Sequence, residues 1–299
     1  MTSISLLGAE RLRQMLQEPN KIIVCPGVYD GLTARLALNV GFDAIYMTGA
    51  GTSMSRLGWA DLGLTTLNDM KENAEMIASL DTTVPVIADA DTGYGGPNMV
   101  ARTVIQYARA GVAALHLEDQ VQTKRCGHLL GKELVDEQVY ISRIKAATAA
   151  RNKIRSRIVI IARTDALASL GFDAAVKRLQ SAVDAGADVV FLEGIRSKEE
   201  GRKVCESMSV PVVLNMVPGG VTPMITAEEA KELGFKLMIC PSVALEAVYR
   251  STMTALKSLK TEGKVDFSQG GPKELFMMCG LQECMDIDKA AGGSSFESI

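Results

Sequence analysis

Eight short apolar runs recur along the chain, and segments with helical periodicity separate them. The runs are Ile22–Cys25, Ala44–Met47, Pro85–Ala88, Ala113–Leu117, Ile158–Ala162, Val189–Leu192, Val212–Leu214 and Leu237–Cys240. Continuous apolar strands that alternate with amphipathic helices are typical of a parallel sheet covered by helices. Eight repeats of this unit predict an α/β chain folded as a closed (β/α)₈ TIM-type barrel.

Glycines support the boundaries of these units. Four of them stand where a predicted helix ends and the next strand begins: Gly41, Gly111, Gly186 and Gly234. Glycine is common there because it adopts the left-handed conformation that ends many helices. A chain of 299 residues is long for one domain but ordinary for a barrel with extensions.

We predict a barrel catalytic domain over residues 1–260 and, in the same domain, a C-terminal helical extension with a flexible tail over residues 261–299. Val243–Lys260 and Pro272–Ala291 have the pattern of helices, and Gly263–Gly271 has that of a loop. The apolar stripe of the second helix, which is rich in methionine, predicts a core or subunit contact.

Composition and charge exclude several classes of protein. The net charge is −3 and no basic cluster is interleaved with aromatic residues, which argues against nucleic-acid binding. No apolar run is long enough to span a membrane, and residues 1–17 lack the apolar core of a signal or transit peptide. The six cysteines have neither zinc-site nor disulfide-framework spacing. These features predict a protein of the cytoplasm.

Polar residues follow most of the apolar runs. They are Thr48, Asp89, Asp91, Glu118, Arg163, Asp165, Glu193, Asn215 and Ser242. The carboxyl ends of barrel strands meet at one mouth, where the active sites of this fold are built. Any one of these residues could instead cap a helix. Their recurrence on successive strands predicts a site.

Two carboxylates, Asp89 and Asp91, lie two positions apart at a strand end, so both can face the same side. Hard oxygen ligands suit Mg²⁺, which keeps several waters and takes one or two protein carboxylates directly. Mn²⁺ is an alternative ion. Asp61 and Glu118 could hold water ligands of the metal. The competing interpretation is that one of the pair caps the next helix.

Arg163 and Glu193 end apolar strands, and buried charges of this kind are rarely left unpaired. An arginine that faces a divalent cation predicts a site for a carboxylate with an oxygen on its α-carbon. The backbone amides of Gly49, Ala50 and Gly127 could bind the remaining oxygens, since glycine allows close approach of a ligand.

The pentapeptide Lys124-Arg125-Cys126-Gly127-His128 places a thiol among cationic side chains and an imidazole. Such neighbours can lower the pKa of a thiol and keep it reactive. The alternative is a solvated basic loop in which the cysteine is incidental.

With Leu117–Gln120 before it and the Asp89/Asp91 pair, this pentapeptide resembles the isocitrate lyase/phosphoenolpyruvate mutase superfamily, over about residues 20–260. The phosphonomutase branch lacks the loop cysteine, so Cys126 points to the carbon–carbon lyases. The chain lacks the insertions of isocitrate lyase itself. It is similar to the group that contains 2-methylisocitrate lyase, 2,3-dimethylmalate lyase and oxaloacetate hydrolase.

The resemblance implies roles for individual residues. Asp89 would contact Mg²⁺ directly, and three further carboxylates would do so through water: Asp61, Asp91 and Glu118. Substrate contacts would come from Tyr46, Thr48, Gly49, Ala50, Arg163, Glu193 and Asn215. Cys126 would be the acid on a mobile loop, tuned by Lys124, Arg125 and His128. The base would be Tyr46 or a hydroxide on the metal. The family also implies a homotetramer with swapped C-terminal helices.

Two positions distinguish the branches. Methylisocitrate lyases carry an arginine after the last strand for an extra carboxylate, where this chain has Glu246. Oxaloacetate hydrolases are expected to carry a serine after the seventh strand, where Pro218 has no donor and offers an apolar surface to a methyl group. We therefore expect cleavage of 2,3-dimethylmalate to pyruvate and propionate. The alternatives are oxaloacetate hydrolysis to oxalate and acetate, then 2-methylisocitrate cleavage, and, outside the enzymes, a barrel that binds dicarboxylates without turnover.

Overall fold

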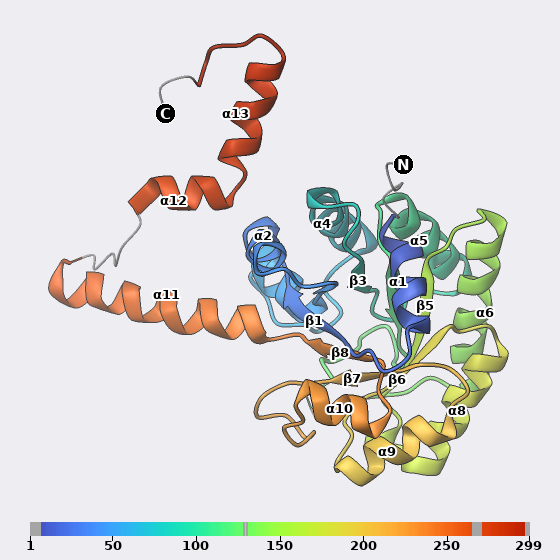
Figure 1. Cartoon of the computed structure of the whole chain (residues 1–299). Coiled ribbons are helices and arrows are strands. Elements are labelled where there is room, and N and C mark those ends of the chain that lie inside the picture. The colour runs from blue at the N-terminus through green and yellow to red at the C-terminus, as the bar shows by residue number, and fades with distance from the viewer. Residues whose placement is uncertain (1–6, 128, 130, 265–270, 297–299) are drawn as a thin grey trace.

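The computed structural model describes residues 7–127, 129, 131–264 and 271–296. Eight parallel strands close into a barrel in sequence order, which confirms the predicted fold (Figure 1). The strands are β1 (Ile23–Val28), β2 (Ile45–Met47), β3 (Val86–Asp89), β4 (Ala114–Leu117), β5 (Val159–Thr164), β6 (Val189–Leu192), β7 (Val212–Asn215) and β8 (Leu237–Cys240). Strands β3, β5 and β7 end on polar residues, so these side chains are held by the barrel itself.

Helices surround the barrel and cover its outer face (Figure 1). Those of the barrel are α1 (Gly8–Gln17), α2 (Gly31–Val40), α3 (Gly49–Thr52), the π-helix η1 (Ser53–Leu57), α4 (Leu67–Leu80), α5 (Pro97–Arg109), α6 (Glu137–Lys153), α7 (Leu167–Leu170), α8 (Phe172–Asp184), α9 (Lys198–Ser207) and α10 (Ala227–Leu233). Those that follow are α11 (Val243–Glu262), α12 (Gly271–Met278) and α13 (Leu281–Ala290).

Helix α1, to which the sequence patterns assigned no element, closes the amino end of the barrel. Leu12 and Met15 pack against the apolar side chains that fill the barrel interior. Arg13 donates to the carbonyls of Arg157 and Ile158, just before β5, and forms an ion pair with Asp188 at 3.1 Å, just before β6. With the amino end filled, the carboxyl ends of the strands remain open for a site.

Inward and outward side chains alternate along each strand. Val159 and Ile161 point into the barrel with Phe191, whereas Ile160 packs under the outer helices. This parity continues past the strand ends, because extended backbone points successive side chains to opposite faces. It therefore decides which residues after each strand face the mouth.

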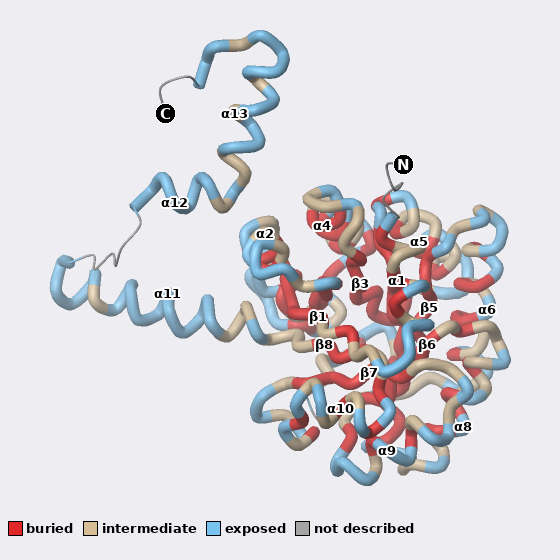
Figure 2. The backbone as a smooth tube through the Cα atoms, viewed as in Figure 1, coloured by how far each residue is buried: buried red, intermediate tan, exposed pale blue. Residues whose placement is uncertain are grey.

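The helices α11–α13, which we call the C-terminal arm (residues 243–290), extend away from the barrel (Figures 1 and 2). None of their described residues is buried. The single helix predicted over Pro272–Ala291 is wrong: it is two helices, because Gly280 takes a left-handed conformation with φ of 86°. No helix in the described part of the chain has both the length and the apolarity to cross a bilayer.

Candidate active site

A cavity of about 200 Å³ opens at the carboxyl ends of the strands. Its described lining residues are Tyr46, Thr48, Ala50, Met54, Asp61, Asp89, Cys126, Gly127, Arg163, Phe191, Glu193, Asn215, Val217, Ile239, Pro241, Ser242 and Leu245. The lining combines polar and apolar side chains. Most of the predicted site residues belong to it, so the structure brings them together.

Asp89 and Asp91 lie side by side at the end of β3, as predicted. The backbone amide of Asp91 donates to Asp89 Oδ1 at 2.8 Å, and Asp91 itself has a left-handed φ of 47°. Gly49 lies against the other oxygen, since a Cβ there would be only 2.3 Å from Asp89 Oδ2. Thr48 holds this turn by accepting a hydrogen bond from the Gly51 amide at 3.3 Å. Glycine is thus required where the metal-site candidate approaches the backbone.

Lys124 is buried between two carboxylates. Its Nζ lies 2.7 Å from Asp61 Oδ1 and 2.5 Å from Asp91 Oδ1. A charge this strongly paired serves the carboxylates first. These ion pairs are contacts that the sequence did not predict, and the expected tuning of the neighbouring thiol by Lys124 stays a prediction.

The carboxylate cluster fits a hydrated divalent cation. Burial, with Asp89 and Asp61 nearby, raises the pKa of Asp91 to about 6, and burial raises that of Glu118 well above its ordinary value. Glu118 Oε2 is buried and accepts no hydrogen bond, although Arg163 Nε lies 3.3 Å away. Among the described residues, no three His, Cys, Asp or Glu side chains converge as metal ligands.

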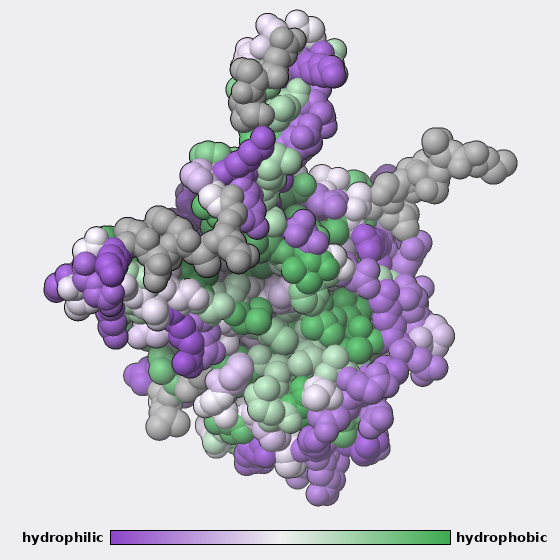
Figure 3. Space-filling view, turned by 60° about the vertical axis from the view of Figure 1, so that its left-hand side comes forward, coloured by the Kyte–Doolittle hydropathy of each residue, from purple (hydrophilic) through white to green (hydrophobic). Residues whose placement is uncertain are grey.

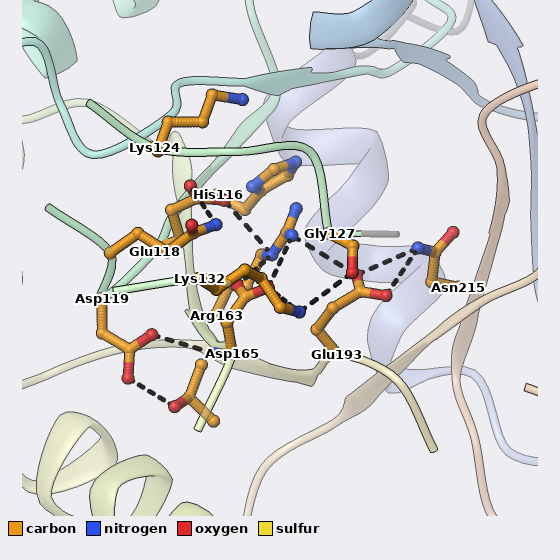
Figure 4. Close-up of polar contacts among 12 residues, drawn as sticks. His116, Glu118, Asp119, Lys124, Gly127, Lys132, Arg163, Asp165, Glu193 and Asn215 are labelled. Atoms are coloured by element: carbon orange, nitrogen blue, oxygen red, sulfur yellow. Dashed lines mark hydrogen bonds and ion pairs between the residues drawn. The ribbon is translucent and has the colours of Figure 1, made fainter. Parts of the chain in front are cut away.

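Arg163 lies at the centre of a network of polar contacts (Figure 4). Its guanidinium donates to both oxygens of Asp165 at 2.9 and 3.1 Å and lies 3.5 Å from Glu193. It also stacks over the Phe191 ring, 5.1 Å from the centroid. Asn215 donates to Glu193 at 3.0 Å, which fixes that carboxylate. Among the described lining residues Arg163 is the one cation, so an anionic ligand has one guanidinium to bind.

His116 is a site residue that the sequence patterns missed. Its Nε2 lies 2.8 Å from the Tyr46 hydroxyl and 3.6 Å from Asp89 Oδ1. Burial lowers the pKa of His116 to about 4, so the imidazole is neutral. Burial and Asp89 raise the pKa of Tyr46 well above its ordinary value. The two rings are therefore a neutral, hydrogen-bonded pair beside Asp89. The signal was parity, because His116 faces inward two residues before Glu118.

Cys126 lines the cavity from a loop of residues 121–133, which we call the Cys126 loop. Its backbone amide donates to the Asp61 carbonyl at 3.2 Å. Gln120 holds the backbone of Arg125 from both sides, accepting from its amide at 3.2 Å and donating to its carbonyl at 2.9 Å. The Arg125 side chain is exposed. His128, expected to tune the thiol, lies outside the described residues.

The two positions used to distinguish the branches lie outside the cavity. Pro218 is exposed and lines a neighbouring apolar groove, as does Glu246, which pairs with Arg250 on its own helix. Both expectations are corrected. The residues that face the mouth are Val217 and, after β8, Pro241. The reason is parity: Val217 follows inward Val213 and Asn215, and Pro241 follows inward Leu237 and Ile239.

Comparisons with known proteins agree with this site. The family model for phosphoenolpyruvate phosphomutase matches residues 12–260. The chain is 38% identical to 2,3-dimethylmalate lyase of Eubacterium barkeri, over 94% of this chain and 96% of that one. A crystal structure of a 2,3-dimethylmalate lyase superposes with a TM-score of 0.96 at 55% identity, covering 98% of each chain. One of oxaloacetate acetylhydrolase with 3,3-difluorooxalacetate gives 0.95 at 51% identity, covering 97% of this chain and 98% of that one. The chain belongs to the phosphoenolpyruvate mutase/isocitrate lyase superfamily.

Proposed function

We propose that the protein is a Mg²⁺-dependent carbon–carbon lyase that cleaves 2,3-dimethylmalate to pyruvate and propionate. The observation that carries the proposal is the mixed lining of the cavity: one cation and three carboxylates share it with a group of apolar side chains that we call the apolar wall. That wall consists of Met54, Val217, Ile239, Pro241 and Leu245.

The polar and the apolar lining residues suit different parts of this substrate. Arg163 and the amides around Gly49 and Ala50 would bind the carboxylate and the oxygen of C2. The apolar wall would receive the methyl groups, whose burial contributes roughly 0.8 kcal/mol each. A tricarboxylate such as 2-methylisocitrate would need another cation. Because Arg163 is the one cation in the described lining, a tricarboxylate is disfavoured.

Mg²⁺ would be held directly by Asp89 and, through water, by Asp61, Asp91 and Glu118. When bound, such an ion polarises the oxygens of an α-oxygenated carboxylate and offsets negative charge that develops there. The fit rests on the donor set, because the four buried carboxylates supply hard oxygen ligands and Glu118 Oε2 accepts no hydrogen bond.

The chain's own residues account for the proton transfers. The C2 hydroxyl proton would pass to the Tyr46 oxygen as Tyr46 gives its own hydroxyl proton to Nε2 of the neutral His116, 2.8 Å away. The C2–C3 bond then breaks, C2 becomes the carbonyl of pyruvate, and the electron pair moves to C3 and its carboxylate. The Cys126 thiol protonates C3 to give propionate. Arg163 stabilises the negative oxygen on C2 throughout, a kind of interaction often worth several kcal/mol.

The direct test is Mg²⁺-dependent release of pyruvate from 2,3-dimethylmalate. A barrel that only binds dicarboxylates would retain the compound without releasing pyruvate, and a phosphonomutase would not need the thiol. Either result would refute the proposed reaction.

Oxaloacetate hydrolysis is the second candidate, favoured by the similarity to oxaloacetate acetylhydrolase. Pro241→Ser would place a hydroxyl donor in the apolar wall, where it could bind a hydrated ketone. We expect the ratio of oxalate release to pyruvate release to rise about fivefold or more, since a hydrogen bond to a polar substrate contributes roughly 1 kcal/mol or more. Pro218→Ser, outside the cavity, is the matched control and should leave the ratio unchanged. An unchanged ratio in Pro241→Ser would show that this wall does not select the branch.

We also propose that the C-terminal arm joins subunits into a homotetramer by swapping its helices. Exposed apolar residues line the arm: Tyr249, Leu256, Leu259, Leu275, Phe276 and Ile287. Figure 3 shows hydrophobic residues on the face of the barrel beside the arm. A groove there, lined by Met216, Met224 and Met238, would receive a partner's helix. Light scattering should give the mass of four 32.0 kDa chains. A monomer in solution would contradict the assembly.

A further inference from the structure

Lys132, in the last part of the Cys126 loop, joins that loop to the Arg163–Asp165 pair. Its Nζ donates to the Gly127 carbonyl at 2.9 Å and lies 2.7 Å from Asp165 Oδ1 (Figure 4). The Lys132 side chain is 10% exposed and that of Asp165 is fully buried. The Lys132 ammonium therefore connects the backbone next to Cys126 with the Asp165 carboxylate, which is hydrogen-bonded to Arg163.

The Gly127 backbone also packs directly against the Arg163 guanidinium. A Cβ on Gly127 would be 2.5 Å from Arg163 Nη2 and 2.9 Å from the Glu193 carboxyl carbon. The loop backbone thus lies directly on the guanidinium, with no room for a side chain between them. Small movements of Gly127 would change where both Cys126 and Arg163 point.

Neutralising Asp165 does not by itself require Lys132. Asp165 already accepts two hydrogen bonds from Arg163, at 2.9 and 3.1 Å. Its backbone is fixed as well, because its amide donates to Asp119 at 2.9 Å and Asp119 is paired with Arg178. What Lys132 adds is the bond to the Gly127 carbonyl, which links the backbone next to Cys126 to the fixed Asp165.

We propose that Lys132 is a positioning residue that seats Cys126 against the cavity by tying the Gly127 carbonyl to Asp165. The first part of the loop has its own anchors, which are the Gln120 side chain and the Asp61 carbonyl. Lys132 supplies the anchor after Cys126. The inference does not depend on the identity of the substrate, because it concerns where the thiol is held.

The experiment follows iodoacetamide alkylation of Cys126, read at that residue by peptide mass spectrometry, with and without Mg²⁺ and oxalate as the probe ligands. Lys132→Met should alkylate about 10- to 100-fold faster than the wild type when the probe ligands are present, since a hydrogen bond to a charged group is lost. With 2,3-dimethylmalate, kcat should fall by a similar factor and KM should change less. Lys132→Arg keeps the positive charge and offers several donors, so it should restore much of the protection.

Two controls separate positioning from loss of folding. Lys177→Met removes an exposed lysine of α8 and should behave as the wild type. Cys25 is fully buried in the barrel, so its alkylation reports unfolding in the same sample. If Lys132→Met alkylates at Cys126 no faster than the wild type in either condition, the proposal is wrong. A rise at Cys126 matched by an equal rise at Cys25 would equally overturn it. Absence of turnover on 2,3-dimethylmalate would reject the proposed function and leave the alkylation result standing.

Discussion

Replacing Cys126 with alanine is expected to lower kcat by about 10²- to 10⁴-fold, the usual contribution of a positioned general acid. Cys126 lines the cavity, and in the proposed reaction its thiol protonates C3 of the substrate. Cys126→Ser should be impaired to a similar degree, because an alkyl hydroxyl is a much weaker acid than a thiol. Steady-state kinetics of pyruvate release measure both.

The matched control is Cys205→Ala. Cys205 belongs to α9 in the outer layer and is absent from the described cavity lining. Its replacement should leave kcat close to that of the wild type. Full activity in Cys126→Ser would refute the thiol as the acid and would move the chain toward the phosphonomutase branch.

The second large effect is expected at Arg163, on stability as well as activity. Arg163→Met would leave the buried carboxylates of Glu118, Asp165 and Glu193 without their shared partner. Removing one partner of a buried ion pair typically costs about 3–5 kcal/mol of unfolding free energy. Loss of the stabilising charge at the reacting oxygen should also reduce kcat/KM by about 10²-fold or more.

Urea unfolding measures the loss of unfolding free energy in Arg163→Met. The control is a matched substitution of an exposed arginine. Arg196 pairs with Glu200 at the surface, with a side chain 55% exposed, so Arg196→Met should cost less than about 1 kcal/mol. Arg163→Lys keeps the charge without the fork of donors and should recover stability more than activity. Equal stability of the Arg163→Met and Arg196→Met variants would show that the network contributes little to folding.

Topology explains why much of the site could be predicted from the sequence. In a parallel barrel every strand ends at the same mouth, so polar residues that follow apolar runs must converge there. The topology alone therefore predicts that five of these residues converge: Asp89, Glu118, Arg163, Glu193 and Asn215. The roles assigned to them remain predictions, because a barrel alone does not define a reaction.

Side chains whose position depends on the path of a loop could not be predicted in this way. Lys124 and Lys132 both leave the Cys126 loop to pair with distant carboxylates, Asp91 and Asp165, and no local pattern encodes those partners. Sequence order assigned Lys124 to the thiol instead. Only the loop's course in three dimensions settles such long-range ion pairs.

The residues of the apolar wall after β7 and β8 were predictable from strand parity. Counting in steps of two from the inward residue Val213 reaches Val217 and passes over Pro218, and from Leu237 the same count reaches Pro241. The same rule finds His116 from Glu118. Strand parity was therefore available in the sequence and was more informative here than the identity of the residue.

The most direct test of the proposed reaction is the initial rate of 2-oxo acid release from 2,3-dimethylmalate, 2-methylisocitrate and isocitrate, with oxalate release from oxaloacetate measured beside them. The account predicts that pyruvate release from 2,3-dimethylmalate is fastest, that chelation with EDTA abolishes it and that Mg²⁺ restores it. Faster oxalate release from oxaloacetate, or turnover that persists without a divalent cation, would contradict it.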